Sequence, residues 1–223
     1  MCKMILTGRT VVVTAGPTRE RLDPVRYISN FSSGKMGYSI AKAALDMGAR
    51  VILISGPVSI PAPEGAEKVD IESTLDLLDA ALKFAPEADI VIQSAAPADY
   101  RPESVSPVKM KKKGGDDMVI RLVENPDVAA TIGKNKRDNQ VFVVFAAETN
   151  DVIDNAKGKL MKKNADMIVA NDVTKPGAGF NVDTNIATIM TMEERFDYPL
   201  MSKTELAGII VEKAFELLKG KNA

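Results

Sequence analysis

Hydrophobic and polar positions along the 223-residue chain alternate in blocks that predict strands and helices in turn. Short β-branched apolar runs that are bounded by turn residues are too short for helices and indicate buried strands. We expect such strands at residues 10–14, 50–55, 69–71, 89–94, 118–123, 141–147, 166–170 and 186–191. The run at 141–147, VFVVFAA, is the strongest of these signals.

Helices are predicted in the segments between the strands. They cover about residues 34–48, 73–84, 125–133, a stretch that ends near 163, and 202–219. Ser33 is the expected N-cap of the first helix, and Gly48 closes it. Asn125 is the expected N-cap of the third, with Pro126 at the first helical position. Capping boxes open the second and the last helix.

This alternation predicts the fold class. It is α/β, with a Rossmann-like open, mostly parallel sheet and helices on both faces. The chain is long enough to bury a large core, and neither an internal repeat nor a linker divides it. We therefore expect a single domain over residues 1–223.

Composition narrows the class of protein. The 29 Lys and Arg residues balance the 30 Asp and Glu residues, so nothing global suggests a nucleic acid or an anionic membrane as partner. No apolar run approaches the ~20 residues of a transmembrane helix, and residues 1–6 are too short for a signal peptide. Cys2 is the only cysteine, which excludes disulfides and favours a cytoplasmic location.

The chain contains no histidine. Histidine is the usual general base and the commonest metal ligand, so serine–histidine hydrolases, cysteine–histidine enzymes and histidine zinc sites are excluded. An enzyme with this sequence works mainly by positioning and electrostatics, through lysine, arginine, asparagine and carboxylate side chains.

Candidate ligand-binding residues gather where strands end. Residues 30–37, NFSSGKMG, precede a helix N-terminus, which suits a phosphate group. The chain has neither G-x-G-x-x-G nor G-x-x-x-x-G-K-[ST], because Lys35 is followed by Met36. A polar insertion at 19–31 lies at the carboxyl ends of the strands, where open α/β sheets bind ligands.

Three later features add charged residues to the candidate set. Asp99 follows a strand and could contact a ribose, a base or a metal, or else cap a turn. Residues 102–117 hold a lysine run, typical either of a solvated mobile segment or of a basic flap that closes over a polyphosphate. Lys159 and Lys163 share one face of a predicted helix.

Eight short motifs run in order along the chain. They are TAGPTRE at 14–20, DPVR at 23–26, NFSSGKMG at 30–37, AAPADY at 95–100, KMKK at 109–112, NPD at 125–127, FAAET at 145–149 and ANDV at 170–173. Each motif alone is weak, but the ordered set closely resembles the phosphopantothenoylcysteine synthetases, in their CTP-dependent bacterial type.

The resemblance implies a ligase of coenzyme A biosynthesis. In that family the carboxylate of 4′-phosphopantothenate attacks the α-phosphate of CTP and releases pyrophosphate. The amine of L-cysteine then attacks the acyl-cytidylate to give the amide and CMP. The carboxylate is already a nucleophile at neutral pH, so the first step needs charge neutralisation by lysines and Mg²⁺ rather than a histidine. The family usually works as a homodimer, a contact that the strand at 186–191 could serve.

The resemblance also implies residue roles. Asn30 matches the asparagine that holds the acyl-cytidylate, Arg26 an arginine associated with its conversion, and Lys109 the flap lysine of the second half-reaction. The positions that fall where the family contacts CTP are Ser32, Gly34, Gly37, Ala95, Asp99, Lys109, Pro126, Asp127, Val128, Ala129, Phe145, Lys159 and Lys163. A phenylalanine in so apolar a strand as that of Phe145 is usually a core residue. Metal ligands are not assigned.

In most bacterial members the synthetase follows a flavin-dependent decarboxylase half, which the resemblance does not cover. Two alternatives stay open, an excised domain of the fused type and a naturally separate protein. A decarboxylase is a candidate further domain or partner, and no flavin is expected in this chain. From the residues alone two alternatives stay open: an NADP-dependent Rossmann-type oxidoreductase, and a non-catalytic nucleotide-binding module. Against the first, the only Tyr-x-x-x-Lys spacing, Tyr38 and Lys42, falls inside the first helix. The second would need no basic flap. The choice of CTP over ATP comes from the resemblance.

Overall fold

The computed structural model describes residues 4–111, 114, 117–148, 152–172, 177–179 and 181–221. The strands are β1 (Thr10–Ala15), β2 (Arg19–Arg21), β3 (Tyr27–Ser29), β4 (Arg50–Ser55), β5 (Glu67–Asp70), β6 (Ile90–Gln93), β7 (Tyr100–Pro102), β8 (Leu122–Glu124), β9 (Val141–Glu148), β10 (Met167–Asp172), β11 (Thr184–Met190) and β12 (Arg195–Ser202). The helices are α1 (Lys35–Asp46), α2 (Thr74–Phe84), the 3₁₀ turn η1 (Ala85–Glu87), α3 (Val128–Lys134), α4 (Val152–Lys162) and α5 (Lys203–Lys221).

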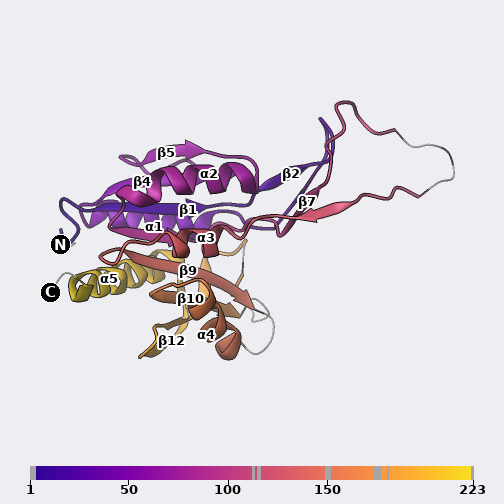
Figure 1. The fold of residues 1–223 in the computed structure, drawn as a ribbon. Coiled ribbons are helices and arrows are strands. Elements are labelled where there is room, and N and C mark those ends of the chain that lie inside the picture. Colours follow the sequence, from indigo (N-terminus) through magenta and orange to yellow (C-terminus); the bar gives the residue numbers. More distant parts are fainter. Residues whose placement is uncertain are drawn as a thin grey trace.

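An eight-stranded sheet runs through the centre of the molecule in the order β12-β11-β10-β9-β6-β1-β4-β5 (Figure 1). Six neighbouring strands of this sheet are parallel, namely β5, β4, β1, β6, β9 and β10. β11 and β12 are antiparallel additions at one edge. Taken in chain order, the six parallel strands lie 3-2-1-4-5-6, the order of a dinucleotide-binding sheet. The predicted Rossmann-like, mostly parallel α/β fold is confirmed.

Each face of the sheet carries its own core. Alternate residues of the parallel strands point to opposite faces, so in β1 Val11 and Val13 pack with α1 and α5, and Val12 packs with α2, α3 and α4. Strands buried on both faces need continuous apolar runs, which is why the central strands were readable from sequence. No helix among the described residues is long and apolar enough to cross a membrane.

The start of α1 differs from the prediction. Its N-cap is Gly34 rather than Ser33, and no side chain caps the helix. Gly34 has a φ of +78°, a left-handed conformation that a Cβ would strain, so the turn into α1 depends on glycine. At the other end Gly48, with a φ of +89°, follows the C-cap as predicted.

The start of α3 differs as well. Its N-cap is Asp127, whose carboxylate accepts a hydrogen bond from the backbone N–H of Ala130 at 3.0 Å. Asn125, the predicted cap, instead donates its side-chain amide to the carbonyl oxygen of Ala98 at 2.9 Å and ties two loops together. The capping boxes predicted at residues 73–76 and 202–205 are confirmed.

Two strand predictions needed correction, and one strand of the central sheet was not predicted. Of residues 118–123 only the end is a strand, because β8 begins at Leu122 and pairs with β7. The strand expected at 69–71 is β5, shifted towards the N-terminus. β12 was missed because it is half exposed and contains Pro199, which an edge strand tolerates. β11 therefore lies between β10 and β12, so its backbone edges are occupied, and a dimer contact through this strand would have to use its side chains.

Two ribbons project from the carboxyl-end side of the sheet (Figure 1). The insertion at 19–31 forms a hairpin of β2 and β3. Beside it, β7 and β8 form the base of a longer projection over the described residues 100–111, 114 and 117–124, which we call the arm. The predicted flap at 102–117 belongs to this arm, but residues 112, 113, 115 and 116 lie outside the described part of the chain.

Candidate functional site

The site is built at the point where the sheet reverses its strand order. β1 and β6 are neighbours, and the chain leaves them in opposite directions, which opens a crevice at their carboxyl ends. The two loops meet there, because Pro17 and Ala96 form a bridge and the N–H of Ala96 donates to the carbonyl oxygen of Gly16 at 2.9 Å. The crevice floor is thus made of hydrogen-bonded backbone.

Buried polar side chains fix the loop after β1 to the rest of the site. The Thr18 hydroxyl, fully buried, accepts a hydrogen bond from the N–H of Ala98 at 2.9 Å. The Glu20 carboxylate, also buried, accepts from the N–H and the hydroxyl of Thr74 at the start of α2. These bonds hold both loops against α2 and give the crevice a defined shape.

A first cavity, of about 390 Å³, lies beside the start of α1, and we call it the α1-side cavity. The amide nitrogen of Asn30 donates to the carbonyl oxygens of Ala96 and Pro97, at 3.2 and 3.0 Å, and so spans the crevice. The predicted site residues that line this cavity are Asn30, Ser32, Gly34, Ala95, Asp99 and Phe145. The expected cradle before α1 is therefore a real concavity.

Gly37, predicted as part of the same cradle, does not line it. A Cβ at Gly37 would lie 2.5 Å from both the Ala15 Cβ and the Ser94 Oγ. Glycine here lets α1 approach the end of β1, as the last glycine of a dinucleotide-binding turn does. Its contribution is to packing that positions the cavity wall.

One wall of the α1-side cavity was not foreseen as functional. Lys203, which the sequence marked only as part of a capping box, is 5% exposed, and its ammonium donates to the carbonyl oxygens of Gly179 and Val182. Burial, reinforced by the nearby Lys35, lowers the pKa of Lys203 against the opposing charge of Asp183. Lys35 pairs with Asp183 at 2.6 Å and lowers the pKa of that carboxyl.

A second cavity, of about 440 Å³, lies on the other side of the crevice beside α3 and α4, and we call it the α3–α4-side cavity. Its predicted lining residues are Ala95, Asp99, Pro126, Asp127, Val128, Ala129, Phe145, Lys159 and Lys163. It shares Ala95, Pro97, Asp99 and Phe145 with the α1-side cavity. The two cavities therefore adjoin, and Phe145, half-buried against the core, contributes to both.

An ion pair crosses the α3–α4-side cavity. Lys163, whose side chain is 17% exposed, contacts the Asp127 carboxylate, which also caps α3. Burial would raise the pKa of Asp127, but the hydrogen bonds from Lys163 and from the Ala130 N–H outweigh it and lower the pKa. Asp127 thus stays ionised and orients the lysine along the cavity wall.

Several lining residues were not predicted, among them Gln93, Tyr100, Glu124 and Asn125. Gln93 is the one with a readable signal, because it is the first polar residue after the apolar run of β6. It is buried, and its Oε1 has no hydrogen-bond partner among the described residues.

Two of the predicted catalytic residues lie outside both cavities. The Arg26 guanidinium pairs with Asp23 at 2.6 Å and donates to the carbonyl oxygen of Met110 on the arm at 2.8 Å. Lys109, next to Met110, is exposed. The structure therefore groups Arg26 and Lys109 with each other where the turn of the hairpin contacts the arm, and apart from Asn30.

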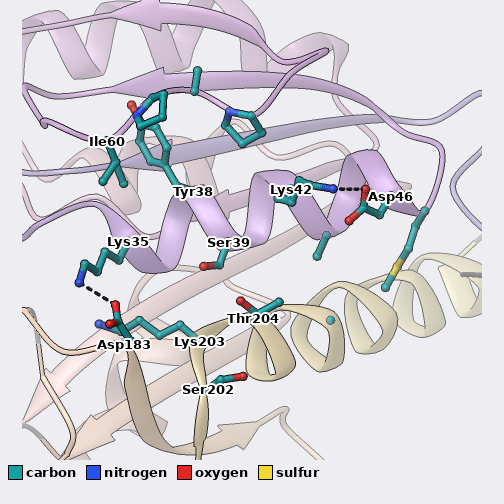
Figure 2. A pocket seen from close by; sticks show the side chains of 16 residues that line it. Lys35, Tyr38, Ser39, Lys42, Asp46, Ile60, Asp183, Ser202, Lys203 and Thr204 are labelled. Atoms are coloured by element: carbon teal, nitrogen blue, oxygen red, sulfur yellow. Dashed lines mark hydrogen bonds and ion pairs between the residues drawn. The ribbon is translucent and has the colours of Figure 1, made fainter.

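A larger cavity, of about 690 Å³, lies along α1, the loop at 60–63 and the start of α5 (Figure 2). Figure 2 shows Lys35 directed at Asp183, and Lys42 directed at Asp46 one helical turn along. None of the predicted site residues lines it. It shares Lys35 and Lys203 with the α1-side cavity, so the two cavities adjoin at the start of α1.

In the part of the chain that the structure describes, no group of three or more Asp, Glu, His or Cys residues could hold a metal ion. A divalent ion at this site would therefore need ligands from a bound phosphate group as well as from the protein.

Comparison with known proteins adds to this geometry. The family described as "DNA/pantothenate metabolism flavoprotein C-terminal domain" matches residues 6–218. The chain is 47% identical over 213 residues to the coenzyme A biosynthesis bifunctional protein CoaBC of Vibrio cholerae, a match that covers 95% of this chain and 53% of that protein. The chain thus spans about half the length of the curated relatives it matches.

Two solved structures show the same architecture. The crystal structure of the C-terminal domain of CoaBC superposes with a TM-score of 0.84 at 40% identity, covering 98% of this chain and 100% of that one. A Cab2 mutant in complex with phosphopantothenate-cysteine superposes with a TM-score of 0.77 at 15% identity, covering 96% and 87%. The second likeness concerns the fold alone.

Proposed function

The chain belongs to the DNA/pantothenate metabolism flavoprotein C-terminal domain family, and on that premise we propose that it is a phosphopantothenate–cysteine ligase of coenzyme A biosynthesis that uses CTP. The observation that carries the proposal is the wall of Ala95, Pro97, Asp99 and Phe145 shared by the two cavities. A reaction between two bound substrates needs adjoining pockets that present the reacting atoms to each other.

In this proposal, CTP occupies the α3–α4-side cavity and 4′-phosphopantothenate the α1-side cavity. Lys159 and Lys163 supply positive charge for the triphosphate. Asn30, whose amide already spans the crevice, lies where the substrate carboxylate would approach the α-phosphate. The carboxylate oxygen forms a bond to the α-phosphorus, and pyrophosphate leaves.

The second half-reaction consumes the acyl-cytidylate. The amine of L-cysteine forms the amide bond to the acyl carbon, CMP leaves, and the amine releases a proton. Lys109 on the arm is the proposed participant of this step. Arg26 binds the arm at Met110, the residue next to Lys109. Because Lys109 lies outside both cavities, this role requires the arm either to move to the crevice of its own chain or to reach the crevice of a second copy.

Mg²⁺ is the proposed companion of the triphosphate. The exposed Asp99 carboxylate, in the wall common to both cavities, fits a single protein ligand to a phosphate-borne ion, in keeping with the lack of a larger carboxylate cluster among the described residues. The ion would supply neutralisation of charge on the phosphate oxygens.

We also propose a homodimer. The hairpin and the arm carry a concentration of large exposed apolar side chains, which is typical of an interaction surface. They are Val25, Tyr27, Phe31, Tyr100, Val105, Val108, Met118, Val119 and Leu122. A decarboxylase that acts on the product, as partner or fused domain, completes the proposed pathway step, in keeping with the bifunctional name of the V. cholerae relative.

The test is pyrophosphate release from CTP and Mg²⁺ with 4′-phosphopantothenate, with and without L-cysteine. Release that requires phosphopantothenate, with amide formed only when cysteine is present, would support the ligase. Asn30→Ala should abolish it, whereas Asn135→Ala, a matched change at the exposed C-cap of α3, should not. Release with ATP but not with CTP would overturn the choice of nucleotide, and silence with both would overturn the ligase.

A further inference from the structure

Gln93 ends β6 at the centre of the crevice. It pairs with Thr14 of β1 on one side and with Val144 of β9 on the other. Val91, two residues earlier, packs in the core under α2, α3 and α4, so Gln93 points to the same face and lines the α3–α4-side cavity. A polar side chain therefore occupies the last inward position of an otherwise apolar strand.

The side-chain carbonyl oxygen of Gln93 is buried without a protein partner. The residue is 6% exposed, and its Oε1 is the single side-chain polar atom so buried and unpaired within the described ranges. Gln140 shows the usual arrangement, since its buried Nε2 donates to the carbonyl oxygens of Ala85 and Ala88 at 2.6 and 2.7 Å. A buried acceptor without a donor opposes folding, so glutamine at position 93 is unfavourable for the protein alone.

The chemistry of the cavity indicates what would satisfy this amide. Phosphate oxygens are acceptors and offer nothing to Oε1, whereas an exocyclic amine is a donor. Apolar side chains on the cavity walls, those of Ala95, Val128 and Phe145 among them, suit a planar ring. A glutamine amide matches a base edge on which an amine lies beside a ring nitrogen, the edge that cytosine and adenine share.

We propose that Gln93 reads the amino edge of the nucleobase, with Oε1 accepting from the exocyclic amine and Nε2 donating to the adjoining ring nitrogen. The inference rests on the proposed function, in which this cavity takes CTP, and adds a specificity-determining residue to it. Burying the unpaired Oε1 costs stability, and this cost is recovered when the nucleotide binds.

The experiment compares CTP with its 4-deamino analogue, pyrimidin-2-one riboside triphosphate, in titrations of the full chain with Mg²⁺. The wild type should bind CTP about tenfold more tightly, the effect of one hydrogen bond of about 1.4 kcal/mol. In Gln93→Leu, which keeps the volume and removes the amide, the two affinities should become equal. Without nucleotide, this variant should melt at or above the wild-type temperature.

Gln140→Leu is the matched control, expected to lower the melting temperature and to leave the CTP preference intact. A preference that persists in Gln93→Leu, or that the wild type lacks, would overturn the proposal. Loss of discrimination against 2′-deoxy-CTP instead would assign Gln93 to the ribose and overturn base reading. Nucleotide binding without ligase turnover would contradict the proposed function and leave the Gln93 assignment standing, whereas a wild type that binds no nucleotide would overturn both.

Discussion

The carboxylate of Asp23 and the guanidinium of Arg26, paired at 2.6 Å, close around the backbone of Met110. Arg26 donates to the Met110 carbonyl oxygen at 2.8 Å, and Asp23 accepts from the Met110 N–H at 3.1 Å. Asp23 also accepts from the N–H groups of Val25 and Arg26 within the hairpin. The pair therefore fastens the arm to the hairpin beside Lys109.

Asp23→Asn should weaken this attachment in a pH-dependent way. The hydrogen bond from Arg26, opposed by burial and helped by the backbone N–H groups, holds the pKa of Asp23 well below its usual range. A lowered folded-state pKa gives stability that is complete above the ordinary value of about 3.9 and is lost as the pH falls towards the lowered one. The loss of unfolding free energy in Asp23→Asn, relative to the wild type, should thus be the same at pH 7 as at pH 6 and should be smaller at pH 3.

Urea unfolding at each pH measures this difference. Asp46→Asn, which removes an exposed pair with Lys42 on α1, is the control and should change the free energy of unfolding little at any pH. If Asp23→Asn had the same free energy of unfolding as the wild type at pH 7, the pair would not stabilise the contact between hairpin and arm.

The central strands were predictable because burial on both faces imposes uninterrupted apolar runs, as in 50–55, which matches β4. The errors lie where residues distant in the sequence determine which cap or strand forms. Asn125 has the composition of an N-cap, yet its amide is bound to Ala98, 27 positions earlier, and Asp127 takes over the cap. β12 depends on pairing with β11 and carries no strong pattern of its own.

The same distinction applies to the site. Most of the predicted residues line the two cavities because their motifs end parallel strands, whose carboxyl ends share one edge. Gln93 and Lys203 were not predicted as site residues. The sequence does not show that Oε1 of Gln93 lacks a hydrogen-bond partner or that Lys203 is buried. Arg26 and Lys109 were predicted by resemblance alone, and they come together because the turn of the hairpin contacts the arm at Met110.

Lys163→Met should weaken binding of CTP by about tenfold or more, because it removes a cation that Asp127 holds along the cavity wall. Lys162→Met is the matched control: Lys162 is exposed and does not line the cavity, so the dissociation constant should hardly change. Titration calorimetry with Mg²⁺ and CTP at two salt concentrations measures both. Equal losses in the two variants would mean that only the general charge of this face matters.

Gly37→Ala tests whether the α1-side cavity depends on the close approach of α1 to β1. The added Cβ would lie 2.5 Å from the Cβ of Ala15, a rigid neighbour in the central sheet, and 2.5 Å from the Ser94 Oγ. Relief requires α1 to move away from β1, which should cost about 1–3 kcal/mol of stability and shift the loop at 30–34 that carries Asn30. Urea unfolding and the pyrophosphate assay should therefore both report a loss.

Gly208→Ala in α5, where an added Cβ meets nothing within 4 Å, should instead raise stability by about 0.5–1 kcal/mol, because alanine favours a helix. If Gly37→Ala were as stable as the wild type but inactive, glycine at this position would serve the ligand directly rather than the packing of α1.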